Sequence, residues 1–139
     1  KKKKKRAFTN DALVDSSIMP ADYPPEIVKE GQVTVVALGP EYENLDEPRL
    51  DALTDVLLQV AETASPPIVV LDLSHTSFFG SAFIEVIFRM WNRLNHREGG
   101  KFTICGLSEY CTEVLEVTHL DQLWETFDTR DAAIKALNP

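Results

Sequence analysis

Three side chains that could carry out hydrolysis lie close together in the sequence: Asp72, His75 and Ser81. A serine deprotonated by a histidine can attack an ester or phosphoester, and an acid can orient the histidine. However, the chain contains no GxSxG, GxxxxGK[ST] or GxGxxG element. A carboxylate at the end of a buried strand can instead accept hydrogen bonds from the loop that follows it. The residues favour this structural role for Asp72 and leave hydrolysis as the weaker alternative.

The cysteines and histidines do not form a metal-ligand pattern. Cys105 and Cys111 match neither a CxxC pair nor a zinc knuckle, and His75, His96 and His119 are scattered along the chain. We therefore expect no metal, no cofactor and two reduced, buried thiols.

Alternating strands and helices must position the residues before Ser81. Residues 26–29 and 32–38 are β-prone and flank a Glu30-Gly31 turn, which predicts an antiparallel hairpin. Asp46-Glu47-Pro48 resembles a helix start, and apolar residues at helical spacing follow it from Leu50 to Ala64.

The continuous aliphatic run from Ile68 to Leu73 is typical of a central strand that is covered on both faces. Apolar residues then recur at helical spacing from Phe83 to Leu94, which predicts a second helix. Ile84 and Phe88 widen this apolar stripe, which would let part of the helix face a partner or a second layer.

The remaining residues predict one more strand and helix, an edge strand and a last helix. We expect a strand over 101–105, a helix capped by Ser108 with Val114, Leu115 and Val117 turned inward, an edge strand within 123–127 and a helix ending at Leu137. This order predicts an α/β fold, with a mixed, mostly parallel sheet of about four or five strands and about four helices.

Charge is distributed unevenly along the chain. The formal net charge is −8, but residues 1–6 are all basic, so residues 7–139 carry eight basic and 22 acidic side chains. The negative charge of residues 7–139 repels phosphate backbones, so we expect no nucleic-acid partner. No run approaches the ~20 apolar residues that span a bilayer, so we expect no membrane segment in this chain and a cytoplasmic location.

Prolines and acidic residues interrupt every apolar run before residue 26. We therefore expect a flexible N-terminal arm over residues 1–25 and a folded domain over residues 26–139. The basic residues 1–6 could be a targeting or polyanion-binding tail, or only a solubilising run.

The segment 68–86, IVVLDLSHTSFFGSAFIEV, resembles the signature of STAS domains (sulphate transporter and anti-sigma factor antagonist). In that family a buried strand ending in D-L-S leads through an apolar pair to a D-S-S-G turn and a helix. Residues 99–108 and 114–120 are similar to later motifs of the family, and residues 127–137 are similar to its closing strand and helix. The resemblance covers about residues 26–138 and implies the STAS-like α/β fold described above.

The resemblance also implies a function: a non-catalytic module of the anti-sigma factor antagonist type that binds a regulatory protein, such as a serine kinase of the anti-sigma type. In these antagonists the partner kinase phosphorylates a hydroxyl of the D-S-S-G turn. Here the turn reads Gly80-Ser81-Ala82-Phe83, so Ser81 matches the first serine and Ala82 replaces the second, which is the acceptor in many antagonists. Ser81 is therefore a candidate phosphoacceptor, or alternatively a plain helix N-cap.

The resemblance further places partner binding at this turn. The docking residues it implies are Gly80, Ser81, Ala82, Phe83 and Glu85. The alternatives are a STAS domain that binds a small ligand or nucleotide, or one that regulates an anion transporter encoded outside this sequence.

Overall fold

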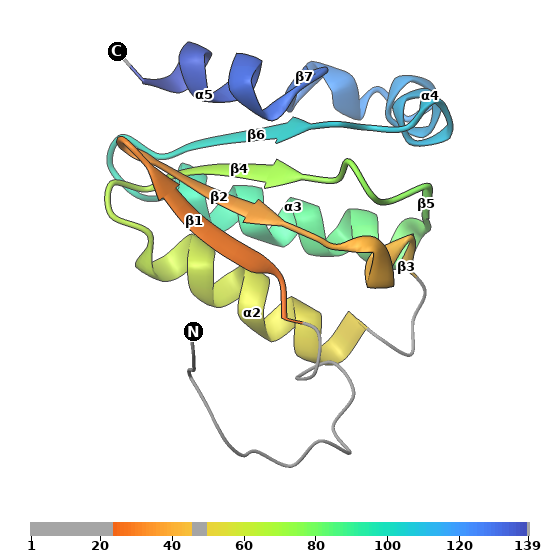
Figure 1. Cartoon of the computed structure of the whole chain (residues 1–139), viewed down its shortest axis with the longest axis horizontal. Helices are drawn as coiled ribbons and strands as arrows, with labels where there is room; N and C mark the ends of the chain where they lie inside the picture. The colour runs from red at the N-terminus through yellow and green to blue at the C-terminus, as the bar shows by residue number, and fades with distance from the viewer. Residues whose placement is uncertain (1–23, 46–49, 139) are drawn as a thin grey trace.

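The structure is a computed structural model that describes residues 24–45 and 50–138 (Figure 1). Apart from Pro24 and Pro25, the N-terminal arm expected over residues 1–25 lies outside the described residues, as does the helix start expected at residues 46–48.

In the described residues, the main sheet has five strands in the order β1-β2-β4-β6-β7. β1 is antiparallel to β2, whereas every other neighbouring pair is parallel. The predicted α/β fold with a mixed, mostly parallel sheet is therefore confirmed. The strands are β1 (Glu26–Glu30), β2 (Val33–Ala37), β4 (Ile68–Asp72), β6 (Lys101–Cys105) and β7 (Glu125–Phe127).

The described residues also form four α-helices and two short 3-10 helices. α2 and α3 pack side by side on one face of the sheet, and α5 contacts β4, β6 and β7 (Figure 1). The helices are α2 (Leu50–Thr63), α3 (Ser81–Asn95), α4 (Glu109–Val117) and α5 (Arg130–Leu137), with the 3-10 helices η1 (Pro40–Tyr42) and η3 (Leu120–Gln122).

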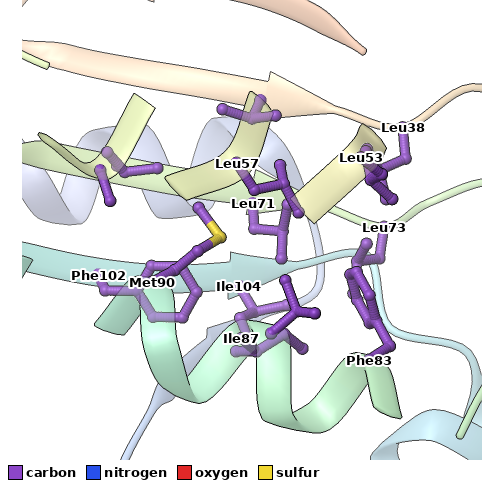
Figure 2. Close-up of a cluster of buried hydrophobic side chains, with 14 of the residues drawn as sticks. Leu38, Leu53, Leu57, Leu71, Leu73, Phe83, Ile87, Met90, Phe102 and Ile104 are labelled. Carbon is purple, nitrogen blue, oxygen red and sulfur yellow. The ribbon is translucent and has the colours of Figure 1, made fainter. Parts of the chain in front are cut away.

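Both faces of β4 are covered, which explains why its sequence is apolar without alternation. Val69 and Leu71 belong to a core that includes buried side chains of α2 and α3, whereas Val70 packs in a second cluster with Ala133 of α5. Figure 2 shows Leu57 of α2 and Met90 of α3 in the larger core.

Two details differ from the sequence predictions. A short parallel pair, β3 (Asn44–Leu45) and β5 (Phe78–Phe79), was not predicted, because two-residue strands carry no readable periodicity. The prediction that Val117 points inward is wrong: it is 69% exposed, since α4 ends at this residue.

Candidate functional site

The turn before α3 leaves the Ser81 hydroxyl open to solvent. Gly80 is the N-cap, with an extended backbone (φ −106°, ψ −171°), and Ser81 is the first helical residue. The interpretation of Ser81 as the N-cap is therefore wrong by one position. Its side chain is exposed and forms no hydrogen bond with any described residue. The hydroxyl is thus free for a modifying enzyme or a partner.

Phe83 does not belong to the exposed part of this turn. Its side chain is fully buried, and its ring lies 5.7 Å from that of Phe79, centroid to centroid. Figure 2 shows Phe83, Ile87 and Met90 on the side of α3 that faces the core. The prediction that Phe83 contacts a partner is therefore wrong, because its helical position places the side chain on the buried stripe. By contrast, Ala82 is half-buried and Glu85 is exposed.

An exposed aromatic pair borders the turn. The ring centroids of Phe78 and Tyr110 are 5.2 Å apart, and these side chains are 39% and 50% exposed. A Cβ placed on Gly80 would lie 4.0 Å from Cζ of Phe78, so the Phe78 ring of the pair lies beside Gly80. Aromatic side chains are enriched in protein interfaces, and exposed apolar side chains that cluster are a feature of interaction surfaces. We call Phe78, Gly80, Ser81, Ala82 and Tyr110 the α3 corner.

Hydrogen bonds hold the two sides of the α3 corner together. The Ser108 hydroxyl donates to the carbonyl of Ser77 at 3.0 Å and accepts from the Cys111 N–H at 3.1 Å. The second bond confirms Ser108 as the N-cap of α4. The N–H of Phe78 donates to the carbonyl of Glu43 at 3.2 Å. The backbone segments that carry Phe78 and Tyr110 are therefore hydrogen-bonded to each other, and the segment of Phe78 is also hydrogen-bonded to Glu43, which follows η1.

Asp72 has the structural role favoured from the sequence. Its side chain is 7% exposed, and its carboxylate accepts from the N–H and hydroxyl of Ser74 at 3.0 and 2.5 Å and from Nε of Arg130 at 2.9 Å. Burial raises the pKa of Asp72, but the hydrogen bonds from Ser74 and Arg130 outweigh it and hold that pKa below its ordinary value. Arg130 could not be recognised as its partner from the sequence, since 58 residues separate the two.

The side chains that suggested hydrolysis are not joined to one another. No hydrogen bond links Asp72, His75 and Ser81 within the described part of the chain, and the carboxylate of Asp72 is already occupied by Ser74 and Arg130. A serine without a bonded base has the low nucleophilicity of an ordinary hydroxyl. In the described residues, Ser81 is therefore an accessible, ordinary hydroxyl and not an activated nucleophile.

An open groove runs beside the α3 corner, between α2 and α3. Its volume is about 770 Å³. Ala82 and Glu85, two of the residues expected to dock a partner, contribute to its wall. We call it the α2–α3 groove; it is lined by Leu50, Asp51, Thr54, Asp55, Ala82, Glu85, Val86 and Arg89.

The other candidate sites can be described briefly. Cys105 and Cys111 are free and buried, as predicted. No cluster of metal-ligating side chains occurs in residues 24–45 and 50–138. None of the described helices is long and apolar enough to cross a membrane.

Comparison with known proteins gives a consistent picture. The family model of the STAS domain matches residues 25–133. An anti-sigma-factor antagonist (STAS) domain protein from Planctomyces limnophilus is 34% identical, with a TM-score of 0.79 over 84% of this chain and 99% of that one. No curated protein matched.

Two more distant structures share the fold. An anti-sigma factor antagonist from Mycobacterium paratuberculosis is 24% identical, with a TM-score of 0.70 over 83% of this chain and 93% of its own. A Thermotoga maritima protein is 19% identical, with a TM-score of 0.68 over 86% of this chain and 97% of its own. From the family match and the Planctomyces limnophilus relative together, the chain belongs to the STAS domain family.

Proposed function

We propose that this chain is a cytoplasmic, non-catalytic regulatory module of the anti-sigma factor antagonist type, which docks its partner through the α3 corner. The observation that carries the proposal is the free, exposed hydroxyl of Ser81 beside the exposed Phe78–Tyr110 pair. The name of the Planctomyces limnophilus protein supports the same class of function.

The Phe78–Tyr110 pair has the properties of the side chains found at the centre of protein interfaces. Aromatic side chains bury a large area at little cost in conformational entropy, and they are enriched among residues that dominate binding energy. Because hydrogen bonds fix the backbone on both sides of the pair, little ordering is required when a partner binds.

Phosphorylation of Ser81 would be the switch for this docking. The partner is a serine kinase of the anti-sigma type, which transfers a phosphoryl group from ATP to the hydroxyl of Ser81. A phosphate on Ser81 would be stabilised electrostatically by the positive end of the α3 dipole, so the modified protein stays folded. It also adds about two negative charges and bulk beside Phe78, and this would release the partner.

A small-ligand function has less support. A cavity of about 320 Å³ lies at the carboxyl ends of β2 and β4 and is lined in part by Glu26, Asp72 and Arg130. Arg130, the guanidinium that could hold an anionic ligand, is bonded to Asp72 and lies 3.9 Å from Glu26. These two carboxylates already neutralise it and would repel a nucleotide phosphate.

Photo-cross-linking tests the docking surface. The full chain would carry benzoylphenylalanine in place of Tyr110, with a matched chain carrying it in place of Ile27, which is also 50% exposed but lies on the edge strand β1. In extracts of the source cells, the first chain should capture an ATP-binding kinase that the second does not. Equal capture by both chains, or by neither, would remove the α3 corner from consideration.

The captured kinase then tests the switch. With ATP it should add about 80 Da to the intact mass of the wild-type chain and to the Ser77→Ala control, but not to Ser81→Ala. If the kinase is captured but no phosphate is added, the docking function stands and the switch does not.

A further inference from the structure

We propose that the α2–α3 groove binds a basic segment of the regulatory partner. This inference rests on the docking function proposed above and specifies the chemistry of the partner. The groove begins beside Ser81, since Ala82 belongs both to its wall and to the α3 corner. A partner bound at the corner therefore reaches the groove without a second, separate site.

The groove carries negative charge on both of its helices. Asp51 and Asp55 lie one turn apart on α2, Glu85 lies on α3, and all three are exposed. Among the described residues, none of the three carboxylates forms an ion pair or a side-chain hydrogen bond. Arg89 is the one cation among the described lining residues, which together have a net charge of about −2.

The floor of the groove is apolar. Leu50 and Val86 are each 5% exposed, and Ala82 is half-buried. Exposed carboxylates above an apolar floor fit a segment with lysines or arginines on either side of a small apolar side chain, because the long stems of these bases can cover apolar surface while their charged ends meet the acids.

Charge also indicates that the occupant is not a second copy of the folded domain. Residues 7–139 carry eight basic and 22 acidic side chains, so two copies would repel each other at this groove. The chain's concentrated basic run, residues 1–6, is the competing occupant, and the experiment below distinguishes it from the partner.

The test compares two variants of the full chain that lose the same charge. The groove variant is Asp51→Asn, Asp55→Asn, Glu85→Gln. The control variant is Glu113→Gln, Glu116→Gln, Asp121→Asn, whose exposed carboxylates lie on α4 and η3, away from α2 (Figure 1). The affinity of each for the kinase captured above is measured by titration calorimetry over a range of NaCl concentrations.

The groove variant should bind roughly ten-fold more weakly than wild type near 0.1 M salt, because three exposed ion pairs are lost. Its affinity should also depend less on salt than that of the wild type, while the control variant keeps the wild-type affinity and most of its salt dependence. Equal affinities for the groove and control variants would overturn the basic-segment proposal and leave the docking function intact. If the wild-type chain itself does not bind the kinase, both the basic-segment proposal and the docking function are overturned.

A third variant addresses the competing occupant. Replacing all six basic residues of 1–6 by glutamine should leave the affinity for the kinase unchanged if the groove is empty before the partner binds. If this variant binds more tightly while the groove variant binds as well as wild type, the chain's own basic run occupies the groove and the proposal is wrong.

Discussion

Nε of Arg130 donates a hydrogen bond of 2.9 Å to Oδ2 of Asp72, so the first residue of α5 is joined to the last residue of β4. The same carboxylate fixes Ser74 at the start of the segment that leads to the α3 corner. The last helix of the chain and the proposed docking surface therefore share one buried carboxylate.

Asp72 should make the stability of the domain depend on pH. Because its folded-state pKa lies below its unfolded value of about 3.9, its contribution is present at neutral pH and is lost as pH falls through the folded value. Asp72→Asn should lower the free energy of unfolding by about 1.5–3 kcal/mol at neutral pH, since hydrogen bonds to a charged group are lost.

Urea unfolding, followed by the fluorescence of the buried Trp124, measures this effect. The difference between wild type and Asp72→Asn should shrink as the pH is lowered below about 4. Glu26→Gln, which removes an exposed carboxylate 3.9 Å from the same arginine, should change stability by less than about 1 kcal/mol. A difference between wild type and Asp72→Asn that stays constant with pH would show that the ionised carboxylate has no stabilising role.

The two thiols should be unreactive in the folded protein. Burial raises the pKa of Cys105 to about 12 and also raises that of Cys111, so neither forms much thiolate near pH 8. Iodoacetamide should label neither cysteine in native buffer and both in urea, as read by intact mass. Rapid labelling of the native protein would contradict the observed burial.

Phe83 should matter for stability and not for docking. Phe83→Ala would remove a fully buried ring and should cost about 3–5 kcal/mol, which endangers the fold itself. The milder Phe83→Leu should lower the free energy of unfolding by about 1–2 kcal/mol and leave the affinity for the kinase unchanged. Weaker binding by a folded Phe83→Leu protein, with its stability unchanged, would return Phe83 to the docking surface.

The elements that were predicted correctly are those whose pattern is local and long. The apolar run from Ile68 to Leu73 and the stripe from Phe83 to Leu94 each span enough residues for their periodicity to be read, and they became β4 and α3. The periodicity of this stripe by itself predicts that Phe83 is buried. The family resemblance instead placed Phe83 in the docking surface.

The features of the site that were missed depend on contacts between distant residues. Phe78 and Tyr110 lie 32 positions apart and meet where Ser108 and Cys111, at the start of α4, contact the carbonyl of Ser77. Adjacent residues of a strand point to opposite faces, which separates the buried ring of Phe79 from the 39% exposed ring of Phe78, but a two-residue strand could not be read from the sequence. The Asp72–Arg130 pair could not be read from the sequence either, because strand ends and helix starts become neighbours only in the folded chain.

The central claim, that the α3 corner docks the partner, is tested most directly by calorimetric titration of the kinase with Phe78→Ala, Tyr110→Ala and Ile27→Ala. All three variants remove an exposed apolar side chain, and their folding is checked by urea unfolding. The first two should each weaken binding by about ten-fold or more, as expected for aromatic residues at the centre of an interface, while Ile27→Ala binds as wild type does. Wild-type affinity in both Phe78→Ala and Tyr110→Ala would contradict the account.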